Sequence, residues 1–258
     1  MKAVILAGGR GTRIAEESHL RPKPMITIGD MPIIWHIMKI YAANGITDFV
    51  ICLGYRGYMI KEYFMNYSLH SAKSVTIDLA AGNTTIDGGS VEPWKVTLVE
   101  TGKETQTGGR VKRVAEFLDE DEPFCLTYGD GLANIDIKAQ LQFHKAHGGQ
   151  ATVAAVAPAA RFGVVEMNAE NQVQQFVEKP RTEGGLINGG FFILSKSVIE
   201  TIAGDATVWE REPMEKLANS GELYAYHHTG FWQPMDTLRE REQLEAMWAS
   251  GKAPWKIW

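Results

Sequence analysis

The chain has 258 residues, of which 45% are hydrophobic and 22% are charged. This length predicts one large α/β domain, or one domain with a small appendage, and the composition gives enough apolar sequence to bury a sizeable core. The formal net charge of −5 argues against broad binding to nucleic acid or to an anionic membrane surface, so any phosphate ligand must be held by a few local cations.

The first third of the chain predicts the order β-loop-α-β-α. Contiguous apolar residues indicate buried strands, and an apolar stripe with proline near its start indicates a helix. The expected elements are a strand over 2–7, a helix over 32–43, a strand over 48–53 and a helix over about 58–66. This order predicts a parallel sheet with right-handed crossovers.

The remaining elements continue the alternation without a repeat or a linker. The expected strands cover 74–80, 96–100, 124–128, 151–158, 163–167, 173–176, 190–194 and 223–227. The expected helices cover 109–118, 135–147, 197–203, 210–218 and 237–250. The aromatic tail over 253–258 is expected to pack on the domain or on a neighbouring subunit.

Two cysteines and the N-terminal sequence limit other possibilities. Cys52 and Cys125 lie in apolar runs and are expected to be buried and inert. The sequence contains no CxxC pair, so we expect no zinc site. His144 and His147 have helical spacing and are expected on a solvent-exposed face. The opening apolar run is too short for a signal peptide, and no stretch reaches the length of a membrane span. We therefore expect a cytoplasmic protein with no nucleic-acid or membrane partner.

A glycine-rich loop, residues 8–13, follows the first expected strand. Ligands of open α/β sheets lie beyond the carboxyl ends of strands, and glycines let backbone N–H groups approach phosphate closely. Arg13 adds a forked cation. The loop differs from a dinucleotide-binding fingerprint, because Ile14 stands where that motif requires a small residue. It is also not a P-loop, because the sequence Gly-Lys-Ser/Thr is missing.

Lys23 follows this loop and lies between Pro22 and Pro24. Because the two prolines restrict the backbone, the lysine is held rigidly, as suits a point charge that stabilises an α-phosphate during attack. The alternative is a surface lysine in a turn.

Together these motifs resemble the family of sugar-nucleotide pyrophosphorylases, nucleotidyltransferases that join a sugar 1-phosphate to a nucleoside triphosphate. The resemblance is found in residues 8–13, 21–25, 128–131, 161–163, 178–180, 188–192 and 232–237. Residues 35–39, 91–94, 230–236 and 252–255 are most similar to the bacterial branch that uses CTP and glucose 1-phosphate.

The resemblance implies a Rossmann-like three-layer sandwich with a mostly parallel mixed sheet, of the nucleotide-diphospho-sugar transferase type. It implies a cytidylyl transfer from CTP to α-D-glucose 1-phosphate, which gives CDP-glucose and pyrophosphate for O-antigen and lipopolysaccharide precursors. One domain would span residues 1–258, with 1–130 mainly binding nucleotide and 131–258 mainly binding sugar phosphate and making oligomer contacts. The resemblance suggests a homo-oligomer, specifically a hexamer.

The resemblance also assigns roles to single residues. Arg13 and Lys23 would be catalytic, and Asp130 and Asp236 would share Mg²⁺; otherwise Asp130 is a turn residue and Asp236 the N-cap of the last helix. The implied nucleotide-binding residues are Leu6, Ala7, Gly8, Gly9, Arg10, Gly11, Thr12, Arg13, Lys23, Thr105, Arg110 and Gly129. The implied sugar-phosphate-binding residues are Tyr128, Gly163, Glu178, Lys179, Asn188 and Gly189.

Arg110 is our candidate for recognition of the base. A guanidinium only donates hydrogen bonds, so it suits the O2 and N3 acceptors of cytosine and would meet an N–H at N3 of uracil or thymine. Gln106 resembles a glutamine of the other pyrimidine branches, which leaves UTP and dTTP open as alternatives. A non-catalytic nucleotide-sugar-binding regulatory protein is a further alternative; an NAD-dependent oxidoreductase is disfavoured by Ile14.

Overall fold

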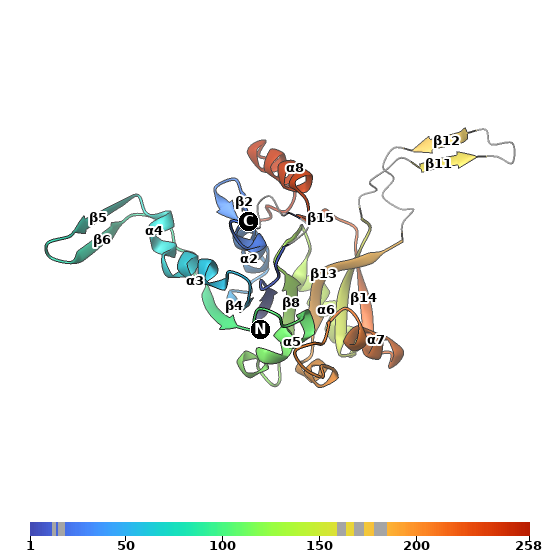
Figure 1. Cartoon of the computed structure of the whole chain (residues 1–258). Helices are drawn as coiled ribbons and strands as arrows, with labels where there is room; N and C mark the ends of the chain where they lie inside the picture. The colour runs from blue at the N-terminus through green and yellow to red at the C-terminus, as the bar shows by residue number, and fades with distance from the viewer. Residues whose placement is uncertain (12–13, 15–18, 159–163, 168–172, 178–184) are drawn as a thin grey trace.

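The computed structural model describes residues 1–11, 14, 19–158, 164–167, 173–177 and 185–258. A seven-stranded sheet lies at its centre with the order β14-β10-β13-β8-β1-β4-β7 (Figure 1). Its strands are β1 (Ala3–Leu6), β4 (Asp48–Leu53), β7 (Lys95–Glu100), β8 (Phe124–Tyr128), β10 (Ala151–Val156), β13 (Ile187–Leu194) and β14 (Leu223–His228). Among the described strands of this sheet, β13 runs antiparallel to both neighbours and the other pairings are parallel. The expected mostly parallel mixed sheet is therefore confirmed.

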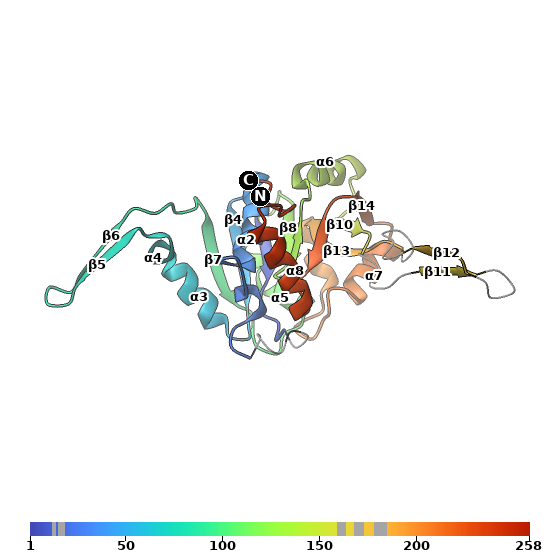
Figure 2. The same ribbon diagram turned by 90° about the horizontal axis from the view of Figure 1, so that it is seen from above.

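Both faces of the sheet are buried, and alternate residues of each strand enter separate cores. In β1, Ala3 and Ile5 join the core under α2, α6 and α8, whereas Val4 and Leu6 join the core under α5 and α7. Helices therefore cover both faces, as Figure 2 also shows, and form the expected three layers. This double burial explains why the strands are almost continuously apolar in sequence. The helices are α2 (Ile33–Ala43), α3 (Gly57–Met65), α4 (Tyr67–Ser71), α5 (Thr107–Arg113), α6 (Ile137–His147), α7 (Glu212–Asn219) and α8 (Leu238–Ala249).

Local capping groups fix several helix ends. The Asp136 side chain accepts a hydrogen bond from the Ala139 N–H at the start of α6, and Gly148 ends the helix at a φ of 69°. Thr237 and Glu240 form a capping box at the start of α8. No described helix is long and apolar enough to cross a membrane.

Two expected helices are shorter or tighter than the sequence indicates. The predicted helix over 109–118 is α5 followed by a 3₁₀ turn, η3 (Ala115–Phe117), and the segment after β13 is the 3₁₀ helix η4 (Lys196–Thr201). A further 3₁₀ turn, η2 (Lys23–Met25), follows the glycine-rich loop.

Several short strands carry little apolar alternation and were not predicted. β6 (Asn83–Asp87) lies in a polar stretch and pairs with β5 (Ser74–Asp78) as a hairpin that projects from the body of the molecule (Figures 1 and 2). Two further small sheets were also not predicted: β2 (Thr27–Ile28) with β3 (Met31–Pro32), and β9 (Gly131–Ala133) with β15 (Trp232–Pro234). The strands predicted over 163–167 and 173–176 are present as β11 (Val164–Met167) and β12 (Val173–Val177), which pair with each other.

The aromatic C-terminal tail packs on the domain itself. Trp255 is fully buried, and its ring stacks on Phe231 and Trp248 with centroid distances of 5.6 and 6.3 Å. Its Nε1 lies 3.4 Å from His36 Nδ1, while His36 Nε2 lies 2.9 Å from the carbonyl of Ile28. Since Nδ1 accepts, His36 carries its proton on Nε2 and donates it to Ile28. Burial lowers the pKa of His36 to about 4.

The predicted solvent exposure is wrong for His144, which is buried, whereas His147 is half-buried. His144 is 5% exposed, and Thr152 Oγ1 lies 2.9 Å from His144 Nδ1 and 2.7 Å from His147 Nε2. The Gly149 N–H donates to His147 Nδ1, so His147 donates to Thr152, which in turn donates to His144. The last turn of α6 lies against β10, and this packing, absent from the sequence pattern, turns both rings inward. Burial lowers the pKa of His144 to about 4.

We expect the free energy of unfolding to decrease as the pH is lowered from about 6.5 to about 4, with a substantial part due to His36. In that pH range the unfolded chain takes up a proton on His36 and the folded chain does not. The contribution of His36 to stability is therefore fully present above the range and is lost as the pH falls through it. The single group accounts for about 3 kcal/mol by this linkage. Urea denaturation at a series of pH values measures it. His36→Gln should reduce the dependence of the unfolding free energy on pH, and the dependence that remains should come partly from His144. An unchanged dependence would contradict the assignment to His36.

Candidate active site

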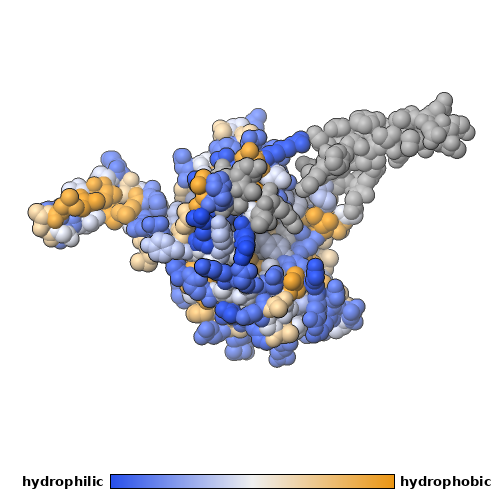
Figure 3. Space-filling model, in the orientation of Figure 1, coloured by the Kyte–Doolittle hydropathy of each residue, from blue (hydrophilic) through white to orange (hydrophobic). Residues whose placement is uncertain are grey.

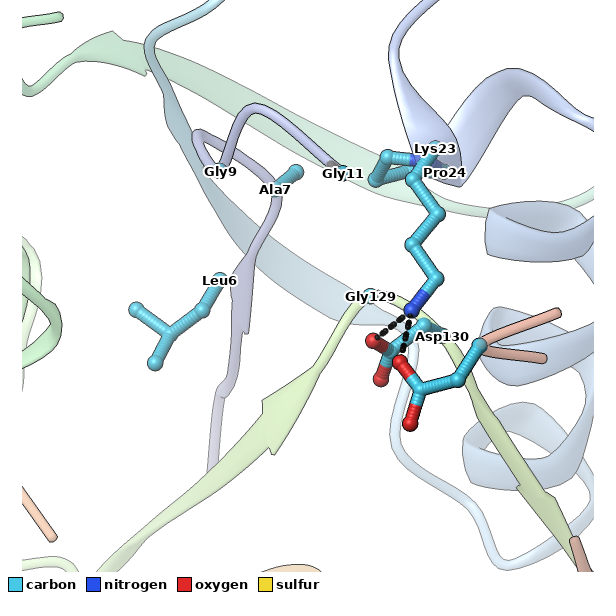
Figure 4. Close-up of a pocket in the computed structure, with 9 residues that line it drawn as sticks. Leu6, Ala7, Gly9, Gly11, Lys23, Pro24, Gly129 and Asp130 are labelled. Atoms are coloured by element: carbon cyan, nitrogen blue, oxygen red, sulfur yellow. Dashed lines mark hydrogen bonds and ion pairs between the residues drawn. The ribbon is translucent and has the colours of Figure 1, made fainter. Parts of the chain in front are cut away.

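The candidate site lies beyond the carboxyl ends of β1 and β8, two neighbouring parallel strands at the middle of the sheet. The glycine-rich loop leaves β1 here, and Gly129 and Asp130 follow β8. Their chain segments enclose a hollow lined by Leu6, Ala7, Gly9, Gly11, Lys23, Pro24, Gly129, Asp130 and Asp236 (Figure 4). All of these except Pro24 were predicted from the sequence to belong to the site.

Lys23 is the centre of this hollow. Its Nζ donates to Asp130 Oδ2 at 2.6 Å and to Asp236 Oδ1 at 2.7 Å, and Figure 4 shows the side chain extended toward Asp130. The Lys23 side chain is 9% exposed, so the surface-turn alternative is wrong. Burial alone would lower the pKa of Lys23, but the charges and hydrogen bonds of the two aspartates outweigh it and the net pKa is raised. The ammonium group therefore stays charged.

Asp236 does not cap α8. The N-cap is Thr237, whose Oγ1 accepts from the Glu240 N–H, while Glu240 Oε2 accepts from the backbone N–H groups of Asp236 and Thr237. The backbone of Asp236 is thus fixed and its carboxylate faces Lys23. Next to it, the Met235 N–H donates to the Asp130 carbonyl at 2.8 Å, which holds the two aspartate segments side by side.

Arg110 is buried under the glycine-rich loop and braces it. Its Nη1 donates to the Leu53 carbonyl at 2.9 Å and to Thr101 Oγ1 at 2.8 Å, and Nη2 donates to the Gly8 carbonyl at 3.1 Å. A Cβ at Gly8 would lie 2.1 Å from Nη1, and one at Gly54 would lie 2.5 Å from it. A side chain at Gly8 would therefore displace the guanidinium from its hydrogen bonds, and one at Gly54 would also meet the Gly8 carbonyl at 2.6 Å. The sequence did not indicate this bracing role.

A second hollow adjoins the first and shares five lining residues with it: Leu6, Gly9, Gly129, Asp130 and Asp236. One wall carries Thr105, Gln106, Thr107 and Arg110, which include two predicted nucleotide-binding residues. A second wall carries Tyr128, Asn188, Gly189 and Trp232, which include three predicted sugar-phosphate-binding residues. The predicted nucleotide-binding residues and the predicted sugar-phosphate-binding residues, which are far apart in the sequence, thus line one cavity.

The other predicted site residues fall into two groups. Arg10 is exposed, pairs with Glu104, and lines a separate surface hollow with Gly54 and Tyr55. Five residues lie outside the described part of the chain, and their predicted roles remain predictions: Thr12, Arg13, Gly163, Glu178 and Lys179.

Trp232 and Glu210 contribute to the site without having been predicted to. Trp232 Nε1 donates to the Gly189 carbonyl at 2.7 Å and fixes that wall. Glu210 accepts hydrogen bonds from Tyr128 and Thr107. The residues 232–237 had been noted as a motif, so Trp232 could have been chosen, whereas nothing in the local sequence marks Glu210.

The family model described as "Nucleotidyl transferase" matches residues 2–233. The chain belongs to this family. Glucose-1-phosphate cytidylyltransferases of Salmonella typhimurium and Salmonella typhi are each 57% identical to it over 258 residues, with complete coverage of both chains. A probable glucose-1-phosphate cytidylyltransferase of Bacillus subtilis is 42% identical over 259 residues, also with complete coverage of both chains.

Solved structures confirm the nucleotidyl transferase fold. HddC from Yersinia pseudotuberculosis, complexed with GMP-PN, matches with a TM-score of 0.70 at 23% identity, covering 96% of this chain and 99% of that one. A UDP-glucose pyrophosphorylase complexed with UDP-glucose matches with a TM-score of 0.69 at 18% identity, covering 97% and 98%. At these identities the likeness concerns the fold, which is the nucleotide-diphospho-sugar transferase type expected from the sequence.

Lys23→Met should lower the free energy of unfolding in metal-free buffer by about 1–3 kcal/mol, because two partly buried carboxylates lose their shared cation and repel each other. Asp130→Asn added to Lys23→Met should restore part of the loss. Lys216→Met, which removes a surface pair with Glu212, is the matched control and should change stability by less than about 0.5 kcal/mol. Urea denaturation measures all four proteins. A double variant no more stable than Lys23→Met would show that carboxylate repulsion is not the cause.

Proposed function

We propose that this chain transfers the cytidylyl group of CTP to glucose 1-phosphate and releases CDP-glucose and pyrophosphate. The main support is the 57% identity to two glucose-1-phosphate cytidylyltransferases over the full length of both chains. The geometry agrees with it, because Lys23 lies at the glycine-rich loop and two walls of distinct chemistry face one cavity. The reaction is an in-line attack of the sugar phosphate oxygen on the α-phosphorus, in which the bond to pyrophosphate breaks as the new P–O bond forms.

The residues of the site would catalyse this reaction by positioning and by charge stabilisation. Backbone N–H groups of the loop, with Arg13, would hold the β- and γ-phosphates that leave together. Lys23 would stabilise the charge that develops on the α-phosphate. Tyr128, Asn188 and Gly189, with Gly163, Glu178 and Lys179, would bind the sugar phosphate. In this proposal residues 1–130 mainly bind nucleotide and 131–258 mainly bind sugar phosphate, within one domain.

Asp130 and Asp236 would hold Mg²⁺. Their fit rests on the donor set: two hard carboxylate oxygens converge on one cation, the Lys23 ammonium, at 2.6 and 2.7 Å. The described residues contain no group of three or more His, Cys, Asp or Glu suited to a metal ion, so triphosphate oxygens would complete the coordination. When bound, Mg²⁺ would neutralise charge on the triphosphate and on the departing pyrophosphate. A bound phosphate that attracted the Lys23 ammonium would leave both carboxylates available to the metal ion.

Arg110 would select cytosine. It lines the wall that also carries Thr105 and Gln106, and the guanidinium hydrogens that do not bond to Leu53, Thr101 or Gly8 are donors, which match O2 and N3 of cytosine. Since it also braces Gly8 and Leu53, substitution will slow the enzyme with every triphosphate. The ratio of CTP to UTP turnover, rather than the rate itself, therefore measures base recognition.

We infer a homo-oligomer, a hexamer by resemblance, from the exposed hairpin β5–β6. Register pairs Val75 with Ile86 and Ile77 with Thr84 on one face, whereas the opposite face is polar. The side chains of Val75, Ile77 and Ile86 are 38, 61 and 41% exposed, and Figure 3 shows the apolar surface on this hairpin. An isolated two-stranded hairpin is marginally stable in water, and an apolar patch of this kind marks an interaction surface. A cytoplasmic location and a place in O-antigen precursor synthesis belong to the same proposal.

Pyrophosphate release with glucose 1-phosphate should be fastest with CTP when CTP, UTP and dTTP are compared in Mg²⁺. EDTA should abolish it and added Mg²⁺ restore it. Arg110→Ala should reduce the CTP-to-UTP ratio by about tenfold, since a mismatched hydrogen bond costs about 1–3 kcal/mol. An unchanged ratio would refute base recognition by Arg110. Faster turnover of UTP or dTTP would refute the CTP assignment, and no turnover with any triphosphate would favour a regulatory nucleotide-sugar-binding protein.

Ile77→Asp should reduce the molar mass of the assembly measured by light scattering, because a charge would be buried in the proposed subunit contact. Thr76→Asp, on the polar face of the same strand, is the matched control and should leave the mass unchanged. An equal mass for all three proteins would place the subunit contacts elsewhere.

A further inference from the structure

One carboxylate joins the two walls of the second hollow. Glu210 lies just before α7, and its Oε1 accepts a hydrogen bond from Tyr128 Oη at 2.6 Å. Its Oε2 accepts a hydrogen bond from Thr107 Oγ1 at 2.7 Å. Each oxygen therefore holds one hydroxyl, and the two hydroxyls belong to residues of different walls, Thr107 beside Arg110 and Tyr128 beside Asn188.

On the nucleotide side, Thr107 is the first residue of α5, the helix that carries Arg110. Thr107 Oγ1 also accepts from the Trp209 N–H at 2.9 Å, so its own hydrogen is directed to Glu210. Two further backbone hydrogen bonds join the same segments, from Gln106 N–H to the Asp205 carbonyl and from Gly109 N–H to the Thr207 carbonyl. The position of this wall thus depends on the segment that ends at Glu210.

On the sugar-phosphate side, Tyr128 is the last residue of β8. Its hydroxyl donates to Glu210 and accepts from Asn188 Nδ2 at 3.2 Å, and Asn188 Oδ1 accepts from the Gly190 N–H at 2.8 Å. Burial and the neighbouring Glu210 raise the pKa of Tyr128 well above its usual value, so the phenol remains a donor. A Cβ at Gly190 would lie 2.5 Å from the Tyr128 ring, which shows how closely this wall is packed.

We propose that Glu210 is a positioning residue that couples the nucleotide wall to the sugar-phosphate wall. The proposal rests on the proposed function, because that function gives the two walls their substrates. Glu210 acts through Thr107 and Tyr128, so a displacement of one wall by its substrate is transmitted to the other through two short hydrogen bonds to one rigid group. Charged acceptors make hydrogen bonds stronger than neutral ones, which suits a carboxylate for this connection.

The chemistry of the pair distinguishes a carboxylate from an amide. A carboxylate accepts from both hydroxyls at once, whereas glutamine accepts with one atom and must donate with the other. The hydroxyl facing that N–H₂ would have to accept from it in addition to its present donor, Trp209 N–H for Thr107 or Asn188 for Tyr128. Glutamine therefore restores one link, and alanine restores none. Because Glu210 is exposed, its removal should affect the fold little.

The experiment measures kcat, both KM values and the melting temperature for wild type, Glu210→Ala, Glu210→Gln and Glu212→Ala. Glu210→Ala should raise the KM of CTP and of glucose 1-phosphate about fivefold each, as the loss of about 1 kcal/mol per wall predicts. Glu210→Gln should recover one of the two KM values. Glu212→Ala removes an exposed carboxylate that pairs with Lys216 on α7, so it is the matched control and should change neither KM.

A double-substitution cycle separates coupling from a general loss of structure. Thr107→Val alone should raise mainly the KM of CTP, and Tyr128→Phe alone mainly that of glucose 1-phosphate. In the Glu210→Ala background both effects should shrink toward zero, because each hydroxyl acts through the missing carboxylate. A merely structural Glu210 would instead lower the melting temperature and leave the effects additive.

Three results would overturn the coupling: unchanged KM values in Glu210→Ala, a change in one KM alone, or full additivity in the cycle. The proposed function is judged separately, by whether the wild type forms CDP-glucose in the same assay. A wild type that forms it, together with a Glu210→Ala variant of unchanged KM values, overturns the coupling and leaves the function in place.

Discussion

The active site depends on one ammonium group held between two carboxylates. Lys23 lies 107 residues before Asp130 and 213 residues before Asp236, yet its Nζ is within 2.7 Å of an oxygen from each. Two partly buried negative charges would repel each other without a cation between them. The lysine therefore makes the close approach of the segments after β8 and β15 possible.

The rest of the site is arranged around this cluster by buried polar contacts. Arg110 fixes the start of the glycine-rich loop at Gly8 and the end of β4 at Leu53. The capping box at α8 occupies the backbone near Asp236 and leaves its carboxylate to face Lys23. These contacts fix the floor of the cavity, while Glu210 connects its walls. Rigid support of this kind is what a reaction catalysed by positioning and charge requires.

The two cores of the domain hold this edge of the sheet in place. Each central strand is buried on both faces, so the carboxyl ends of β1 and β8 stay in register and bring Leu6 beside Tyr128. The docked C-terminal tail, with Trp255 against His36, adds to the core that carries α2 and α8. Helix α8 packs in this core and begins two residues after Asp236, so the core also holds the segment that carries this carboxylate.

The sequence by itself determined the strands of the central sheet, most of the helices, the family and the position of the glycine-rich loop, because apolar periodicity and contiguous motifs are local signals. It also identified Lys23, Asp130 and Asp236, which are far apart along the chain but each belong to a recognisable motif. It could not reveal the bracing by Arg110, the inward rings of His144 and His147, or the role of Glu210, since each depends on a partner far along the chain. Only the tertiary structure decided these, because long-range hydrogen bonds and burial arise when separate segments pack together.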